Sequence, residues 1–384
     1  MAHILLVANW DWVLFHFRLP LARGLCQAGH RVTLVAPAGD YTDRLKSLGY
    51  TVADWPLERR STNPAGELRA VVRLHALYVR LRPDVVHHFT IKPNLYGSLA
   101  CWWMGAQRPR VINTFSGLGF LFWSSWRARV LRRLLLPLLR GALGQHCQWT
   151  VFQNRADRER FITDRLVWPD RARLIPGSGV DTTAFFPASK ARRQRPVVLT
   201  AVRLLWDKGL ADLVQAARIL RRQRIDVEFW VAGGPDTGNP ANIPDSVLYA
   251  WRASGLIRLL GHQEDIAGLL RQADIGLLAS HHEGFSRFLL EAAATGLPLI
   301  ATDIPGCRML VRPGRNGTLV APRAPAAIAA AVADLLANPG QMARYGCESR
   351  GIAEAEYSEE RIVAQYLDLY QDVCRDEAAS FCTI

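Results

Sequence analysis

The sequence contains no pair of cysteines spaced as CxxC, although it has seven cysteines among its 384 residues. That absence argues against a zinc site and a disulfide framework, and it fits a reducing cytoplasm best. No apolar run approaches the roughly 18 residues that a membrane-spanning helix needs. No basic leader or cleavage site precedes the first apolar segment, so we expect an unprocessed N-terminus. With 49% hydrophobic and 21% charged residues, the chain has a globular composition and the length for two domains.

Acidic residues are missing from a long stretch of the first half. Residues 85–156 contain no Asp or Glu, yet they hold nine Lys or Arg and five of the twelve tryptophans. Inside this stretch, residues 126–144 have helical spacing, with arginines on one side and leucines on the other. A basic amphipathic helix flanked by tryptophan is typical of a segment that lies in a membrane interface over anionic lipid. The residues that we expect at the membrane surface are Trp123, Trp126, Arg129, Arg132, Arg133 and Arg140.

Two other interpretations of residues 126–144 stay open. The helix can pack against the core and turn its basic face to solvent. The net charge of +13 is also compatible with nucleic acid as a partner. No recognised nucleic-acid motif accompanies the charge, so we expect no nucleic-acid partner and favour peripheral, monotopic membrane attachment.

Short apolar runs alternate with helix-like segments along the whole chain. In the first half, strand-like runs lie at 3–8, 31–37, 83–89, 110–115 and 148–154, with a helix from about Leu19 to Ala28. A polar, basic stretch at 186–196 has the composition of a linker. A second series follows, with runs at 196–204, 227–234, 257–261, 274–280 and 297–303.

This alternation predicts an α/β protein with two doubly wound, Rossmann-like domains, each a parallel sheet covered on both faces. We place the first domain at 1–185 and the second at 195–355. A final helix at about 359–375 is expected to pack back on the first domain. Two such domains predict a ligand cleft that the carboxyl ends of their strands face.

Two cations follow the first strand of the second domain, in the segment RLLWDKG. Arg203 and Lys208 lie five residues apart at a strand-to-helix turn. An arginine fork and a lysine point charge together suit a diphosphate. The alternative is an ordinary solvated turn.

The segment HHEGFSRFLLEAAATG, residues 281–296, combines two carboxylates with small residues at the start of a helix. Gly284 allows close approach of the backbone to a ligand. The N–H groups of Phe285, Ser286 and Arg287 offer an anion site. Glu291, more than two turns into the helix, can accept hydrogen bonds from sugar hydroxyls, and Glu283 can reach another part of the same ligand. Alternatively, Glu283 is an exposed loop acid and Glu291 caps the helix or pairs with an arginine.

Taken together, these motifs resemble those of the family 4 retaining glycosyltransferases of the GT-B fold. The resemblance rests on GVD (179–181), RLLWDKG (203–209), the long block at 277–308 and NGTLV (316–320), and it covers nearly the whole chain. In the first half, the segments at 87–100 and 112–120 resemble the N-acetylgalactosaminyltransferase branch, which acts on undecaprenyl-diphosphate-linked sugars.

The resemblance implies a UDP-sugar donor, a polyprenyl-diphosphate-linked acceptor and transfer with retained anomeric configuration. Arg203 and Lys208 are then expected to bind the donor diphosphate, Glu291 the ribose hydroxyls and Glu283 the donor sugar near the reacting carbon. The backbone at 284–286 is expected to contact phosphate or sugar, and the turn at 261–265, with His262, to line the base. Cationic side chains and helix N-termini neutralise the leaving group in such enzymes, so we expect no metal and no cofactor.

Two departures from the family pattern concern the acceptor side. The segment after the first strand, NWDWVLFHFR (9–18), has no glycine, and Phe115 stands where many members have histidine. The acceptor-side candidates are His87, His88, Lys92 and Asn94, because HHFTIKP follows a strand and faces the expected cleft, and Lys92 suits a lipid diphosphate. A packed or surface histidine is the alternative for His88.

Two other functional classes stay open. A nucleotide-sugar 2-epimerase has the same two-domain architecture, but it does not need a basic surface rich in tryptophan. A non-catalytic scaffold of an assembly complex is the second alternative. For the transferase we expect attachment to anionic lipid of the inner leaflet, at the cytoplasmic face of the inner membrane.

Overall fold

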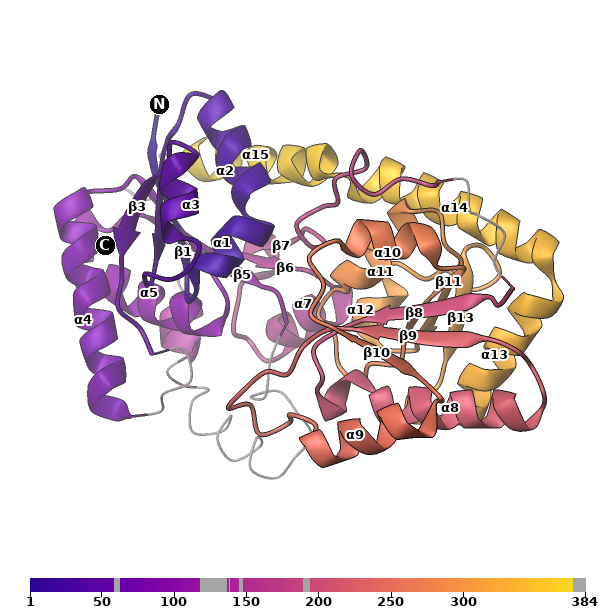
Figure 1. Ribbon diagram of the computed structural model, residues 1–384. Coiled ribbons are helices and arrows are strands. Elements are labelled where there is room, and N and C mark those ends of the chain that lie inside the picture. Colours follow the sequence, from indigo (N-terminus) through magenta and orange to yellow (C-terminus); the bar gives the residue numbers. More distant parts are fainter. Residues whose placement is uncertain (59–62, 118–136, 138, 145–147, 189–193, 376–384) are drawn as a thin grey trace. The chain divides into compact units, whose positions relative to one another are not determined.

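The computed structural model describes residues 1–58, 63–117, 137, 139–144, 148–188 and 194–375. The chain forms two compact units (Figure 1). Unit 1 comprises Met1–Ser178 together with Ile362–Ile384, and unit 2 comprises Gly179–Arg361.

Unit 1 is built on a parallel sheet of seven strands in the order β3-β2-β1-β4-β5-β6-β7. Its strands are β1 (His3–Ala8), β2 (Arg31–Ala36), β3 (Thr51–Asp54), β4 (Val85–Phe89), β5 (Arg110–Phe115), β6 (Gln148–Phe152) and β7 (Ala172–Leu174). β1 pairs with both β2 and β4, so that Ile4 lies between Val32 and Val85. The strand order therefore reverses between β1 and β4, as in a doubly wound fold.

Helices cover both faces of the unit-1 sheet. On one face lie α4 (Pro64–Leu81) and α5 (Ile91–Trp103), and on the other lie α2 (Leu19–Gln27) and α15 (Glu359–Arg375). α4 buries Ala70, Val71, Leu74, Leu77 and Tyr78, at the spacing that places side chains on one helical face. Shorter helices of this unit are α1 (Asp11–Phe17), α3 (Thr42–Ser47) and α7 (Arg155–Thr163).

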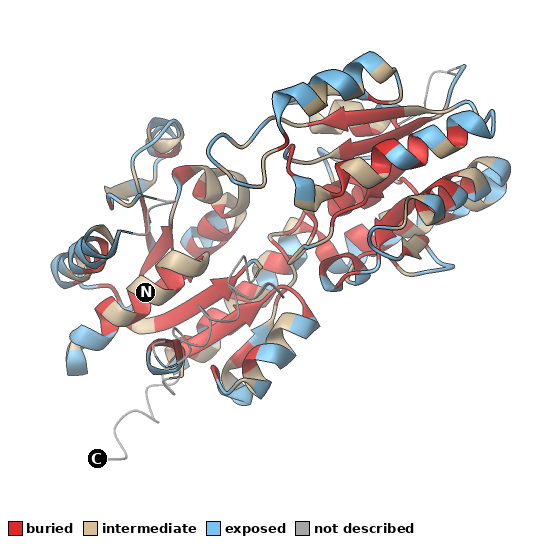
Figure 2. Ribbon diagram, turned by 90° about the horizontal axis from the view of Figure 1, so that it is seen from below, coloured by how far each residue is buried: buried red, intermediate tan, exposed pale blue. Residues whose placement is uncertain are grey.

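Unit 2 carries a parallel sheet of six strands in the order β10-β9-β8-β11-β12-β13. Its strands are β8 (Val197–Ala201), β9 (Glu228–Ala232), β10 (Arg258–Gly261), β11 (Ile275–Leu278), β12 (Leu299–Thr302) and β13 (Gly317–Val320). α8 (Leu210–Arg222) and α13 (Pro325–Ala337) cover one face, and α11 (Arg287–Ala294) and α14 (Pro339–Tyr357) cover the other. The remaining helices are α9 (Asp245–Ser254), α10 (Ile266–Gln272) and α12 (Pro305–Arg308). Most strand residues of both units are buried (Figure 2), which explains why these strands read as continuous apolar runs.

The predicted α/β class and the two doubly wound sheets are confirmed. Three strands were not predicted from the sequence: β3, β7 and β13. Each has three or four residues, and their burial is interrupted. These segments are too short and too mixed in polarity to produce a clear apolar run.

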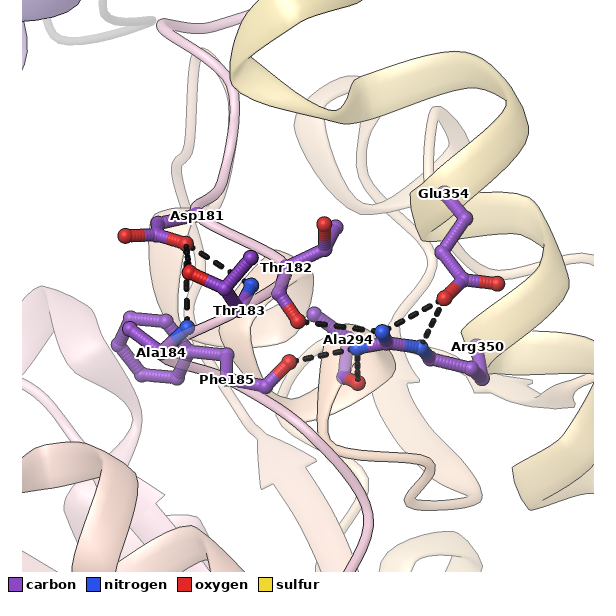
Figure 3. A network of polar contacts seen from close by, with 8 residues as sticks. All are labelled: Asp181, Thr182, Thr183, Ala184, Phe185, Ala294, Arg350 and Glu354. Carbon is purple, nitrogen blue, oxygen red and sulfur yellow. Dashed lines mark hydrogen bonds and ion pairs between the residues drawn. The ribbon is translucent and has the colours of Figure 1, made fainter.

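Unit 2 begins earlier in the chain than the sequence suggested, at Gly179 rather than near residue 195. The cause is visible around Arg350 of α14 (Figure 3). Its guanidinium donates hydrogen bonds to the carbonyl oxygens of Thr182, Phe185 and Ala294, and it pairs with Glu354. Asp181 in turn accepts hydrogen bonds from the backbone of Thr183 and Ala184. This network fixes residues 181–185 to unit 2.

Candidate active site

The sheet of unit 2 reverses its strand order between β8 and β11. From β8 the chain adds β9 and β10 on one side, and it then returns to add β11, β12 and β13 on the other. β8 and β11 pair in parallel, with Ile275 opposite Val198. Chain segments diverge after such a pair of strands, and ligands of open α/β sheets bind at that point. The candidate active site consists of the segments that follow β8, β9, β10 and β11.

The segment after β8 contains a 3-10 turn, η4 (Trp206–Lys208), followed by Gly209. Gly209 has a φ of 68°, and a Cβ at this position would lie 1.9 Å from the carbonyl oxygen of Ala279. Only glycine satisfies both conditions. It therefore allows the η4 turn to lie against the segment that leaves β11.

Lys208 and Glu283 form an ion pair at this reversal point, with 2.8 Å between Nζ and Oε1. Both side chains are largely buried, at 12% and 16% exposed. Gly306 packs behind Glu283, where a Cβ would lie 2.5 Å from the Glu283 carbonyl oxygen. A partly buried pair is screened less than a surface pair. The arrangement presents a cation and a carboxylate side by side, which suits a ligand that carries phosphate next to hydroxyl groups.

α11 begins directly beyond Glu283. Ser286 caps the helix, because its hydroxyl accepts a hydrogen bond of 3.2 Å from the N–H of Leu289. The first N–H groups of a helix favour an anion, and Gly284 has no side chain to shield them. The ring of Phe285 packs against Tyr357, with 5.6 Å between centroids. The Phe285 side chain therefore packs against the core of unit 2 and is partly buried.

Glu291 lies in α11 and pairs with Arg287, with 2.6 Å between Oε1 and Nε. Burial raises the pKa of the Glu291 carboxyl, and the Arg287 guanidinium opposes that shift. Pairing with an arginine is the alternative that the sequence left open. A carboxylate has about four lone-pair sites, so the arginine contact does not use the full hydrogen-bonding capacity of Glu291.

Arg203 and His262 lie at the ends of the neighbouring strands. The Arg203 guanidinium is exposed and pairs with Asp236, at 2.6 Å. His262 follows β10 and is exposed, and its Cβ lies 3.8 Å from the position of a Cβ at Gly234. Arg203 and His262 thus occupy the same edge of the unit-2 sheet as Lys208 and Glu283.

Sequence reasoning did not single out Gly233 and Asp236. Gly233 has a φ of 142°, and a Cβ there would lie 1.8 Å from the carbonyl oxygen of Val202. Its N–H also donates a hydrogen bond of 2.7 Å to the carbonyl of Gly261. Gly233 therefore holds the ends of β8, β9 and β10 close together. A pair of glycines directly after the apolar run VEFWVA was the available signal.

The structure contradicts the prediction that His88 faces an open site. His87 and His88 lie inside β4, not after it, and both are fully buried. The ring nitrogens of His88 are hydrogen-bonded to Tyr78 and Asn113, each at 2.8 Å. Burial lowers the pKa of His88 to about 4. This is the packed histidine that the sequence left as the alternative.

Lys92 and Asn94 lie in the first turn of α5. Lys92 pairs with Glu67 at 2.7 Å, and Glu67 also accepts a short hydrogen bond from Tyr96. Asn94 is fully buried and donates a hydrogen bond of 3.0 Å to the carbonyl of Thr114. Of the four acceptor-side candidates, Lys92 is therefore the one that is partly exposed.

Most of the predicted membrane residues lie outside the described part of the chain: Trp123, Trp126, Arg129, Arg132 and Arg133. Arg140 is described and exposed, and it donates a hydrogen bond of 3.1 Å to the carbonyl of Asp164. Within the ranges that the structure covers, no helix is long and apolar enough to cross a membrane. Those same ranges contain no group of three or more His, Cys, Asp or Glu that could hold a metal ion.

Each of the two units matches a protein-family model. The model for glycosyl transferases group 1 matches residues 195–338. The model for a glycosyl transferase 4-like domain matches residues 3–142. The chain belongs to the family 4 glycosyltransferases. The predicted GT-B fold agrees with a sucrose-phosphate synthase structure from Thermosynechococcus elongatus, with a TM-score of 0.80 and 19% identity over 98% of this chain and all of the other.

Two curated relatives of this glycosyltransferase are informative. The first is the N,N'-diacetylbacillosaminyl-diphospho-undecaprenol alpha-1,3-N-acetylgalactosaminyltransferase of Campylobacter jejuni. It is 26% identical over 94% of this chain and 96% of the relative. The second is the UDP-Gal:alpha-D-GlcNAc-diphosphoundecaprenol alpha-1,3-galactosyltransferase of Escherichia coli, 26% identical over 66% of each chain. Both relatives are named for undecaprenyl-linked acceptors.

Proposed function

We propose that this glycosyltransferase moves an N-acetylhexosamine, such as GalNAc, from a UDP-sugar to an undecaprenyl-diphosphate-linked saccharide, with retained anomeric configuration. The observation that carries the proposal is the Lys208–Glu283 pair at the reversal point of the unit-2 sheet, beside the N-terminus of α11. The names of the two relatives support the acceptor class, and one of them names a UDP-sugar donor.

Each residue of the site has a proposed role in donor binding. Lys208, Arg203 and the first N–H groups of α11 hold the diphosphate. Glu291 accepts hydrogen bonds from the ribose, and His262 lies beside the base. Glu283 positions hydroxyl groups of the donor sugar. On donor binding, the Lys208 ammonium group contacts phosphate in addition to Glu283. The Glu283 carboxylate oxygens then accept hydrogen bonds from the sugar.

In the proposed reaction, the bond between the anomeric carbon and the leaving phosphate oxygen breaks. The acceptor hydroxyl oxygen forms the new bond to the same carbon, on the same face. The proton of that hydroxyl moves to the leaving phosphate oxygen, so no carboxylate nucleophile is needed behind the sugar. Lys208 and Arg203 stabilise the charge that develops on the diphosphate. We propose that these side chains and the helix N-terminus suffice without a metal ion.

The reaction takes place on a lipid-linked acceptor, so we also propose peripheral attachment to anionic lipid at the cytoplasmic face of the inner membrane. Lys92 is the proposed contact for the lipid diphosphate. The net charge of +13 favours an anionic surface.

The test is mass spectrometry of lipid-linked products after incubation with undecaprenyl-diphosphate-sugar acceptors and a panel of UDP-, GDP- and ADP-sugars, with and without EDTA. The proposal expects a product that is one N-acetylhexosamine heavier, formed with a UDP donor in both conditions. Interconversion of the free nucleotide sugar without a lipid product would instead identify an epimerase. A Glu283→Gln variant with full activity would contradict the role of Glu283.

A further inference from the structure

The outer side of α4 exposes large apolar side chains. Leu68, Val72 and Val79 are 56%, 50% and 50% exposed. Isolated apolar residues on a surface are ordinary, but these three recur at the spacing of one helical face. At about 100° per residue, their directions fall within an arc of roughly 40°. They therefore form an apolar stripe along the helix, with His75 on nearly the same side in the two-turn interval between Val72 and Val79.

A band of arginines borders this stripe. Arg69, Arg73 and Arg80 are exposed, and at about 100° per residue they point roughly 100° to 140° away from Leu68. The buried side of α4 begins beyond them. In cross-section the helix thus has three sectors: a core-facing side, an arginine band and an outward apolar stripe. Helices that lie in a membrane interface combine such apolar and basic sectors.

Two tryptophans of the neighbouring helix extend the apolar stripe. Trp102 and Trp103 end α5 and are 57% and 44% exposed. His75 of α4 connects the two helices, because its ring meets the Trp103 ring edge-on with 6.1 Å between centroids. His75 Nδ1 also lies 3.0 Å from the carbonyl oxygen of Ala100. α4 and α5 lie together in unit 1 (Figure 1), and the His75–Trp103 contact places Trp103 beside the helix that carries the stripe.

Acidic residues are few in α4 and α5. Glu67 is the single acidic residue in the sequences of α4 and α5, and it pairs with Lys92. Arg69 and Arg73 also line a cavity of about 470 Å³, together with the acidic residues Asp54, Glu58 and Glu67. Asp54 accepts a hydrogen bond from the N–H of Ala38 at 3.0 Å. Arg80 and Arg82 continue the positive charge at the far end of α4.

We propose that Leu68, Val72, Val79, Trp102 and Trp103, with the bordering arginines, form a surface that binds an anionic lipid bilayer. We call it the α4–α5 surface. Tryptophan is favoured at the headgroup level of membranes, and arginines near an anionic leaflet strengthen binding. This inference specifies which residues contact the anionic lipid of the proposed function. Its biological role rests on that proposed function. It assigns membrane contact to described residues outside 126–144.

The experiment measures binding of the full chain to vesicles of equal parts phosphatidylglycerol and phosphatidylcholine, and to vesicles of phosphatidylcholine alone. The first variant combines Trp102→Ala with Trp103→Ala, and the second combines Leu68→Ser with Val72→Ser. Leu48→Ser is the matched control, because Leu48 is 55% exposed in unit 1 but lies outside the surface. Circular dichroism checks that each variant is folded.

We expect the tryptophan variant to lower the partition coefficient about tenfold or more, because less apolar area is buried in the interface. Replacing Arg69, Arg73 and Arg80 with Gln should weaken binding to the anionic vesicles by about fivefold per arginine, with little effect on neutral vesicles. Leu48→Ser should bind as the wild type does.

Three results would overturn the proposal. The first is that the wild-type protein fails to bind anionic vesicles. The second is that the tryptophan and leucine variants bind as tightly as Leu48→Ser. The third is a wild-type dimer in light scattering that the tryptophan variant dissociates, which would identify a protein interface. Sugar transfer to a water-soluble, short-chain acceptor tests the proposed function independently of membrane binding. That activity should survive in the surface variants, and its absence in the wild type would contradict the transferase proposal alone.

Discussion

The reversal points of the two sheets place their polar residues differently. In unit 2, Lys208 and Glu283 stand in the segments that follow β8 and β11, and they retain some exposure. In unit 1, the reversal lies between β1 and β4, but His87 and His88 are strand residues with no exposure. A parallel sheet covered on both faces buries alternate side chains on either side. A polar residue therefore reaches a ligand when it follows a strand, and it becomes part of the core when it lies within one.

The largest effect is expected from the Lys208–Glu283 pair. Lys208→Ala should lower kcat/KM by about 100- to 1,000-fold, because the leaving diphosphate loses a preorganised cation. Steady-state kinetics with the lipid-linked acceptor measures the loss. Arg222→Ala, an exposed arginine at the end of α8, is the control and should keep wild-type kinetics. Equal activities of the two variants would remove the basis for placing the site at the unit-2 reversal.

The buried histidines of unit 1 make stability depend on pH. Folding lowers the pKa of His88 from 6.5 to about 4, so the unfolded chain binds a proton that the folded chain excludes between these values. The contribution of neutral His88 to the free energy of unfolding is fully present above pH 6.5. It is lost as pH falls toward 4, which lowers the free energy of unfolding by on the order of 3 kcal/mol. Burial also lowers the pKa of His87, which acts in the same direction. Urea unfolding across this range measures the slope.

Substitution of His88 distinguishes a packed residue from a ligand contact. His88→Ala should reduce the free energy of unfolding by about 1–3 kcal/mol, because the buried Tyr78 hydroxyl and Asn113 amide lose their partner. Activity per folded molecule should stay near that of the wild type. The opposite pattern, intact stability with a large rise in KM for the acceptor, would show that the unit-1 reversal carries a ligand contact through His88.

The smallest effect is expected at Glu291. Glu291→Gln removes the charge but keeps the shape and one acceptor oxygen, so the KM for the nucleotide sugar should rise about tenfold with little change in kcat. Arg287→Gln, which removes the partner of Glu291, should change the same KM by a smaller factor. A fall in kcat without a change in KM would assign Glu291 to the chemical step instead of ribose binding.

The sequence predicted the regular parts of this molecule because the strands are buried on both faces and read as apolar runs. It also placed Lys208, Glu283 and the start of α11 at one sheet edge, since each follows a strand. It could not determine which side chains pair, such as Arg203 with Asp236 or Glu291 with Arg287. From the sequence alone, a partner 33 residues away cannot be distinguished from one that lies a single helical turn away. The run at 83–89 ends at Phe89, as β4 does, but the sequence could not show that the side chains of His87 and His88 are packed into the core.

Calorimetric titration of UDP into the wild type, Lys208→Ala and Arg222→Ala, in the presence of EDTA, tests the central claim most directly. If the reversal point of the unit-2 sheet holds the donor diphosphate, the wild type and Arg222→Ala bind UDP with the same Kd, and Lys208→Ala binds at least about tenfold more weakly. One Kd for all three proteins would contradict the assignment of the donor site to this edge of the sheet.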